Sequence, residues 1–143
     1  MTAAQVLLVE DDEMIVDVVR VSLSLAGYNV THVSDGAAAL HTITGLHPDI
    51  VILDLMLPNV DGWKVLSDMR AHPETADIPV IVMTAKTMPA DEIRSYNLGA
   101  SAYIRKPFLP QDLIDKVEQL VRDGVAISPR SPRQQARVGP RSL

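Results

Sequence analysis

Apolar residues in this chain form short uninterrupted runs that alternate with longer segments of helical periodicity. Continuous apolar runs of this length are typical of strands that are buried on both faces of a sheet. The strands expected from these runs cover residues 6–9, 29–33, 49–53, 79–83 and 101–104. After each run, apolar residues recur at spacings of three and four, which predicts an amphipathic helix.

Turn and capping residues set the bounds of these helices. Gly27 and Gly99 are expected just past the ends of the first and fourth helices, because glycine tolerates the positive φ of a helix C-terminal stop. Ser34-Asp35-Gly36 and Asp61-Gly62 are expected to begin the second and third, and His72-Pro73 to end the third. The fourth helix is expected over about 89–98. The last is marked by Leu113, Ile114, Val117, Leu120 and Val121.

Five strand–helix pairs in strict alternation predict an α/β fold with a parallel sheet and helices on both of its faces. Right-handed crossovers restrict the topologies that such a chain can adopt. We expect a flavodoxin-like five-stranded sheet in the order 2-1-3-4-5.

The composition suits one domain with an aliphatic core. Of the 143 residues, 47% are hydrophobic but only 3% are aromatic, and there is no cysteine, which excludes disulfides, thiolate metal sites and cysteine nucleophiles. We expect the domain to cover 1–123. Residues 124–143, rich in Pro, Ser and Arg without apolar periodicity, are expected to form a disordered tail or linker.

Charge is divided unevenly between these two parts. Residues 1–123 carry all 18 acids and nine of the 13 Lys and Arg residues, a net charge of −9, whereas residues 124–143 carry four Arg and no acid. The acidity of residues 1–123 argues against their binding nucleic acid. The four dispersed arginines of residues 124–143, without aromatic residues among them, would form only a weak nucleic-acid-binding patch. No signal peptide and no apolar run long enough to span a bilayer is evident, so we expect a cytoplasmic protein without membrane contact.

The chemistry is expected to centre on Asp54, an acid at the carboxyl end of an apolar strand, which is an unusual place for one. An ionised carboxylate is costly to bury unless it is paired, hydrogen-bonded or bound to a metal. In a parallel sheet all the carboxyl ends lie on one edge, where ligands bind. Four expected strands end there in reactive groups: Glu10 and Asp11, Asp54, Thr84, and Lys106.

Glu10, Asp11 and Asp54 cannot all stay ionised in one crevice without a cation nearby. Oxygen ligands without cysteine or suitably spaced histidine indicate Mg²⁺, with Mn²⁺ as a substitute. A carboxylate beside Mg²⁺, a lysine and a threonine hydroxyl suits phosphorylation of an aspartate. Asp54 would be the nucleophile, Lys106 would neutralise phosphoryl charge, and the Thr84 hydroxyl and backbone N–H groups near Met56 and Ala85 would donate to phosphoryl oxygens.

Over roughly residues 4–123 the sequence resembles the receiver domain of two-component response regulators. The matching motifs are Leu7-Leu8-Val9-Glu10-Asp11-Asp12, Asp54-Leu55-Met56-Leu57-Pro58 with Asp61-Gly62, Thr84-Ala85, and Lys106-Pro107. The resemblance implies a signalling switch that accepts a phosphoryl group from a histidine kinase or phosphotransfer protein onto Asp54. It does not imply an enzyme that turns over external substrates.

The resemblance also implies roles for particular residues. Asp11, Asp54 and the Met56 carbonyl would bind the metal directly, and Glu10 would act through water. The Lys106–Pro107 bond would be cis, Thr84 and Tyr103 would form the switch, and residues about 88–122 would contact a downstream protein or a second copy of the chain.

Two residues at the site mouth differ among relatives of this type. Met56 is apolar and cannot position an attacking water, from which we expect slow self-dephosphorylation. Lys86, two residues after Thr84, places a long cation at the mouth of the site, although an ordinary solvated lysine is the simpler interpretation.

Other interpretations stay open at this point. The chain could be a receiver module of a longer regulator whose output domain is absent, or an interaction module that never takes phosphate. A phosphatase of the aspartate-nucleophile type would need a second aspartate where Met56 stands. The four histidines lack the spacing of metal ligands and are expected at the surface: His32, His41, His47 and His72. Trp63 is expected to be half-exposed.

Overall fold

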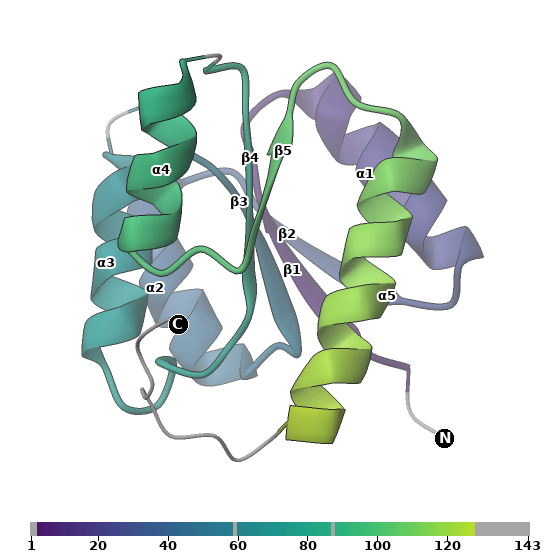
Figure 1. Ribbon diagram of the computed structural model, residues 1–143. Coiled ribbons are helices and arrows are strands. Elements are labelled where there is room, and N and C mark those ends of the chain that lie inside the picture. The colour runs from purple at the N-terminus through teal and green to yellow at the C-terminus, as the bar shows by residue number, and fades with distance from the viewer. Residues whose placement is uncertain (1–2, 59, 87, 128–143) are drawn as a thin grey trace.

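The computed structural model describes residues 3–58, 60–86 and 88–127, and it forms a five-stranded parallel sheet between two helical layers (Figure 1). The strands are β1 (Gln5–Val9), β2 (Asn29–Val33), β3 (Ile50–Asp54), β4 (Val80–Thr84) and β5 (Ala102–Arg105). The helices are α1 (Glu13–Leu25), α2 (Gly36–Leu46), α3 (Gly62–Ala71), α4 (Pro89–Asn97) and α5 (Pro110–Ile127). The strand order is β2-β1-β3-β4-β5, which confirms the predicted topology.

Helices α1 and α5 cover one face of the sheet, and α2, α3 and α4 cover the other (Figure 1). Alternate residues of the central strands point into two separate aliphatic cores, as the period of a strand requires. Leu7 and Leu53 belong to the core beneath α2 and α3, whereas Leu8 and Ile52 belong to the core beneath α1 and α5. Burial on both faces explains why these strands appear in the sequence as uninterrupted apolar runs.

The expected element bounds are close to the observed ones. Strands β3, β4 and β5 each begin and end one residue later than the pattern predicts, so that Asp54 and Thr84 are themselves the last residues of their strands. Helix α5 continues to Ile127, four residues beyond the expected domain boundary. The rest of the predicted tail, residues 128–143, lies outside the described residues.

Helix α4 is the least buried of the described helices. Ser95 is the buried residue on it, and its N-cap residue Met88 makes no side-chain capping hydrogen bond. Polar contacts join it to its neighbours: Glu92 pairs with Arg105 of β5 at 3.5 Å, and the Arg94 guanidinium lies 4.2 Å from the Trp63 ring centroid. Trp63 is 8% exposed, so the expectation of a half-exposed residue is wrong. The Arg94 guanidinium lies over the ring, and Trp63 belongs to the aliphatic core beneath α2 and α3.

None of the described helices has the length and apolar character that crossing a bilayer requires.

Candidate functional site

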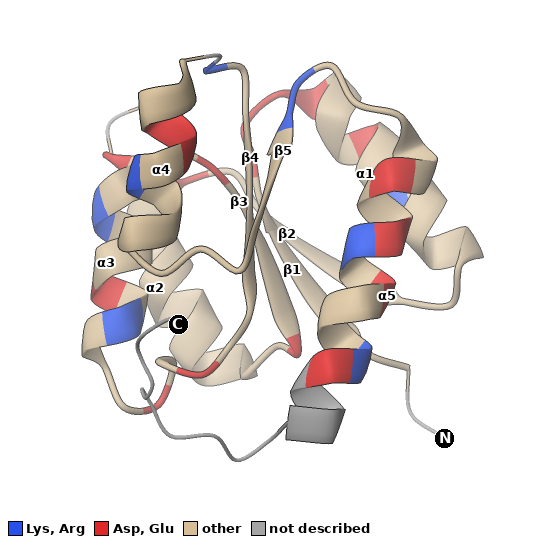
Figure 2. Ribbon diagram, in the orientation of Figure 1, with Lys and Arg blue, Asp and Glu red and all other residues tan. Residues whose placement is uncertain are grey.

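Three carboxylates meet at the carboxyl ends of β1 and β3. The two strands are neighbours in register, with Val9 opposite Leu53, so Glu10 and Asp54 follow on from adjacent residues. Oxygen atoms of Glu10, Asp11 and Asp54 all lie within 4.8 Å of one another. Glu10 is 0% exposed and Asp54 is 2% exposed, whereas Asp11 is open to solvent. Figure 2 shows this acidic end of the sheet beside a basic segment that follows β5.

Local hydrogen bonds shape the turn between β1 and α1 that carries two of these acids. Glu10 Oε2 accepts from the backbone N–H groups of Asp11 at 3.2 Å and Asp12 at 3.1 Å. Asp12 in turn caps α1 by accepting from the Met14 N–H at 2.9 Å. A short polar side chain that caps a helix N-terminus fixes the direction in which the chain enters the helix. The turn is therefore held from both sides.

Lys106 lies between two of the carboxylates. Its Nζ is 2.7 Å from Glu10 Oε1 and 3.1 Å from Asp54 Oδ2, and its side chain is 16% exposed. The Lys106 backbone N–H donates to the Thr84 carbonyl at 2.9 Å, which extends the pairing of β4 with β5 to this residue. The Lys106–Pro107 bond is cis, as the resemblance implied.

Burial dominates the electrostatics of Glu10. It raises the pKa of the carboxyl group to about 7, and the nearby Asp54 adds to this effect, while Lys106 and the Asp12 N–H oppose it. Burial would lower the pKa of Lys106, but its contacts with Glu10 and Asp54 outweigh that and leave the pKa raised. Without a metal, the ammonium therefore holds its charge, and the Glu10 carboxyl group takes up a proton at a higher pH than an ordinary glutamate does.

Thr84 and Met56 come from the two chain segments next to Asp54, the end of the neighbouring strand β4 and the loop that follows β3. Thr84 ends β4, next to β3 in the sheet, and its fully buried side-chain hydroxyl accepts from the Lys86 N–H at 3.2 Å. The Met56 N–H donates to Asp54 Oδ1 at 2.9 Å, while the Met56 side chain is 55% exposed at the mouth of the site. Ala85 follows Thr84 and is exposed. Tyr103 is buried on β5, and its hydroxyl donates to the Lys86 carbonyl at 3.1 Å.

The loop after Asp54 returns to α3 through a position that only glycine can occupy. A Cβ on Gly62 would lie 2.5 Å from Leu55 Cα and 2.9 Å from the Asp54 carbonyl oxygen, both backbone atoms. Asp61 caps α3 by accepting from the Trp63 N–H at 3.0 Å, as the sequence predicts. The Asp61-Gly62 pair thus starts the helix and lets it approach the strand that ends in Asp54.

Sequence reasoning missed one residue near the site. His32 was expected at the surface, but it is half-buried on β2, and its Nε2 lies 2.7 Å from the Glu10 carbonyl oxygen. The available signal was positional: His32 is the penultimate residue of the strand that pairs with β1, opposite Leu8. Spacing between histidines could not reveal it, because the partner is a backbone atom.

The donor set fits a divalent cation. Within the described part of the chain, buried Glu10 Oε1 has an ion-pair contact with Lys106 but no directed hydrogen bond, so it can still accept one. The candidate metal ligands from side chains are all carboxylate oxygens, and hard oxygen ligands suit Mg²⁺ rather than softer metals. The charge of two deeply buried acids and one exposed acid also exceeds that of the Lys106 ammonium beside them, and a cation would neutralise the remainder.

Comparison with known proteins agrees with this geometry. The family model described as the response regulator receiver domain matches residues 6–118. A DNA-binding dual master transcriptional regulator, RpaA of Synechocystis sp., is 39% identical over 118 residues, which are 82% of this chain and 49% of that protein. The transcriptional regulatory protein GltR of Pseudomonas aeruginosa is 37% identical over 82% of this chain and 48% of its own. The chain thus spans about half the length of these curated relatives.

The similar solved structures are also response regulators or receiver domains. A putative response regulator from Chloroflexus aurantiacus has a TM-score of 0.80 at 32% identity, covering 84% of this chain and 98% of that one. The receiver domain of the sensor histidine kinase PA1611 from Pseudomonas aeruginosa, with a magnesium ion coordinated in its active-site cleft, has a TM-score of 0.77 at 28% identity. The match covers 84% of this chain and 98% of that one. Because the family model matches residues 6–118 and the sheet order agrees with it, this chain belongs to the response regulator receiver family of two-component signal transduction.

Proposed function

We propose that this chain is a phosphorylation-controlled signalling switch in which Asp54 accepts the phosphoryl group. The observation that carries this proposal is the environment of Asp54: a 2% exposed carboxylate at a strand end, 3.1 Å from the Lys106 ammonium and grouped with two further acids. A structural role alone does not require three acids and a lysine to converge at one sheet edge. The unfavourable charge is understandable if the site serves a reaction.

In the proposed reaction, an Asp54 carboxylate oxygen bonds to phosphorus as the phosphorus–nitrogen bond of a phosphohistidine breaks. The electron pair of that bond stays on the departing imidazole nitrogen. Lys106 balances charge on the phosphoryl oxygens, and the Thr84 hydroxyl and the N–H groups of Met56 and Ala85 donate hydrogen bonds to them. Asp11, Asp54 and the Met56 carbonyl would hold Mg²⁺, with Glu10 acting through water. When bound, Mg²⁺ would supply positive charge beside the phosphoryl oxygens.

The donor would be a sensor histidine kinase or a phosphotransfer protein, and the output would be altered protein binding. Support for an output face at about residues 88–122 comes from exposed apolar side chains on and beside α4 and α5, including Ile93, Tyr96 and Leu109. Thr84 and Tyr103 would couple the site to this face, since Tyr103 of β5 already contacts the segment after Thr84 through the Lys86 carbonyl. A downstream protein and a second copy of the chain are both possible occupants.

Binding of this domain to nucleic acid is not part of the proposal. The first relative named above is described as DNA-binding, but this chain matches only 49% of it. The domain's surplus of acids opposes contact with a phosphate backbone. The proposal also holds if the chain is the receiver module of a longer regulator.

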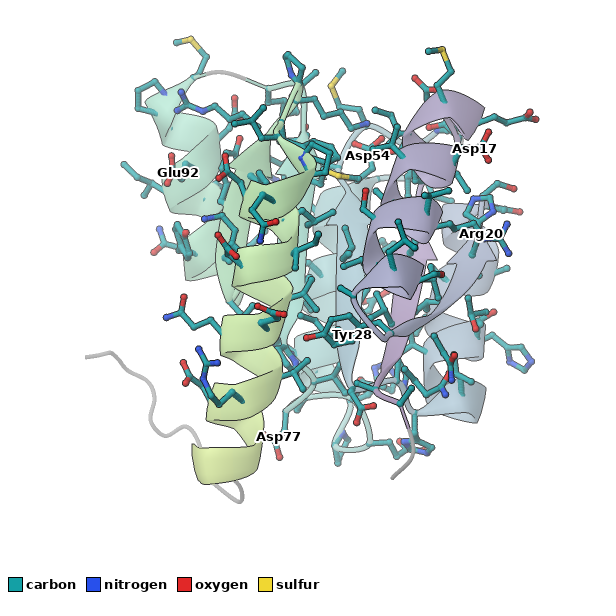
Figure 3. All side chains as sticks on the ribbon, turned by 90° about the vertical axis from the view of Figure 1, so that its right-hand side faces the viewer. Asp17, Arg20, Tyr28, Asp54, Asp77 and Glu92 are labelled. Atoms are coloured by element: carbon teal, nitrogen blue, oxygen red, sulfur yellow. The ribbon has the colours of Figure 1, made fainter. Side chains whose placement is uncertain are left out.

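Acetyl phosphate with MgCl₂ provides a direct test. Intact mass spectrometry of the wild-type chain is expected to show the addition of one phosphoryl group, labile to hydroxylamine, and Asp54→Asn is expected to abolish it. Asp77→Asn is a matched control, because Asp77 is an exposed aspartate at the opposite end of the molecule from Asp54 (Figure 3). Absence of an adduct on the wild-type chain would instead support an interaction module that works without phosphorylation.

A further inference from the structure

His32 contacts the backbone of the acidic turn from a neighbouring strand. Its Nε2 lies 2.7 Å from the carbonyl oxygen of Glu10, which is 22 residues away in the chain. A carbonyl oxygen can only accept a hydrogen bond, so Nε2 carries the proton and donates it. The contact is a cross-strand hydrogen bond from a half-buried side chain to a residue that is fully buried.

This hydrogen bond lies just past the point where backbone pairing between β1 and β2 ends. The two strands pair in register from Gln5 and Asn29 to Val9 and Val33, and one more bond runs from the Glu10 N–H to the Val33 carbonyl at 3.1 Å. Strand β2 then ends, and Asp35 caps α2. If β2 continued, one of its backbone N–H groups would donate to the Glu10 carbonyl. In this structure the His32 side chain donates to that carbonyl instead.

We propose that His32 is a positioning residue for the metal-binding acids. Glu10 and Asp11 lie in the turn between β1 and α1, so the orientation of the Glu10 peptide sets where both carboxylates begin. His32 fixes that peptide from β2, while Glu10 Oε2 fixes it from within the turn by accepting from the N–H groups of Asp11 and Asp12. Supporting contacts that orient ligands from outside the ligand set are a general feature of metal sites. This inference rests on the proposed function in assigning a divalent cation to Glu10, Asp11 and Asp54.

Removal of the His32 hydrogen bond should have different effects on stability and metal affinity according to whether the bond is purely structural or positions the metal ligands. Loss of a structural bond lowers the free energy of unfolding and leaves the metal affinity of the folded protein unchanged. Loss of a positioning bond lowers the metal affinity of a protein that is still folded. The chain offers a conservative replacement, because the amide nitrogen of glutamine can occupy the place of imidazole Nε2, whereas that of asparagine is one methylene short.

The test is Mn²⁺ titration of the folded proteins, followed by the electron paramagnetic resonance signal of the free ion. We expect His32→Leu and His32→Asn to bind Mn²⁺ on the order of three- to tenfold more weakly than the wild type, as the loss of one hydrogen bond allows. We expect His32→Gln to keep most of the affinity. His41→Leu is the matched control, since His41 is an exposed histidine on α2, and it should bind like the wild type.

The proposal is overturned if His32→Leu and His32→Asn bind Mn²⁺ as tightly as the wild type, or if His32→Gln is as weak as His32→Asn. The comparison of Gln with Asn keeps the test decisive if the leucine variant does not fold. Failure of the proposed function looks different: the wild-type chain would bind Mn²⁺ in a His32-dependent manner yet take no phosphoryl group from acetyl phosphate.

Discussion

The Lys106 ammonium lies 3.1 Å from Asp54 Oδ2, so a cation supplied by the protein itself pairs with the proposed phosphoryl acceptor. The same ammonium is 2.7 Å from Glu10 Oε1. One lysine thus neutralises part of the charge of two buried acids, one that follows β1 and one that ends β3.

Replacement of Lys106 by methionine is expected to destabilise the metal-free protein by about 2–4 kcal/mol, because two buried carboxylates then lose their cation. Added MgCl₂ should recover part of that loss, since a bound cation takes over the charge balance. Urea unfolding with EDTA and with MgCl₂ measures both effects. A Lys64→Met variant, which removes an exposed lysine of a surface pair, is the control and should change stability by less than about 1 kcal/mol. Equal stability of the two variants in EDTA would contradict this account of the site.

The pH dependence of stability should reveal the buried carboxyl group of Glu10. Burial raises its pKa from 4.5 to about 7 in the folded protein, with Asp54 adding to the effect and Lys106 opposing it. Between these two values the unfolded chain releases the Glu10 proton while the folded protein keeps it. A rise in pH across this range therefore favours unfolding.

We expect the free energy of unfolding of the metal-free wild type to fall relative to that of Glu10→Gln as the pH rises from 4.5 to about 7. The difference should be on the order of 3 kcal/mol and should level off above that range. Denaturant unfolding of both proteins in EDTA at several pH values measures it, because the other titrating groups largely cancel in the comparison. Parallel curves for the two proteins would show that Glu10 is not the titrating group.

Met56 is expected to prolong the phosphorylated state. Its side chain is 55% exposed at the mouth of the site and offers no hydrogen bond to an attacking water. We expect Met56→Asn to lose its phosphoryl group about tenfold faster, which corresponds to a barrier about 1.4 kcal/mol lower. Phosphate release after removal of acetyl phosphate measures the rate. Met14→Asn, at an exposed methionine of α1, serves as the control, and a rate for Met56→Asn no faster than that of the wild type would refute the assignment.

Two glycine-to-alanine variants should shift stability in opposite directions. Alanine at Gly62 would place a Cβ 2.5 Å from Leu55 Cα, so the loop that follows Asp54 must move. We expect a loss of about 2–4 kcal/mol and slower phosphorylation. A Cβ at Gly45, inside α2, would meet nothing within 4 Å, and alanine there should stabilise the protein by about 0.5–1 kcal/mol. Thermal unfolding of the two variants is the measurement, and a neutral Gly62→Ala would mean that the close approach of α3 to β3 is not required.

Much of the fold could be predicted because local patterns and global packing agree. The strand at residues 50–54 is buried on both faces, and its sequence shows this as an unbroken apolar run that stops at an acid. Gly27 and Gly99 have positive φ values, as expected for residues just past a helix end. The bounds were less certain, and β3, β4 and β5 are offset by one residue because pairing between strands, rather than local hydrophobicity, decides where a strand ends.

The sequence shows the order of the acids, the threonine and the lysine along the chain. Once alternation implied a parallel sheet, it also determined that they share one edge. The contacts are evident only in the folded structure: Lys106 lies between Glu10 and Asp54, Arg94 lies over the Trp63 ring, and His32 donates to the Glu10 carbonyl. The physical reason is that spacing along a chain predicts which face or edge a residue occupies. A hydrogen bond or ion pair depends on distances of a few tenths of an ångström, and these are fixed only when segments far apart in sequence pack together.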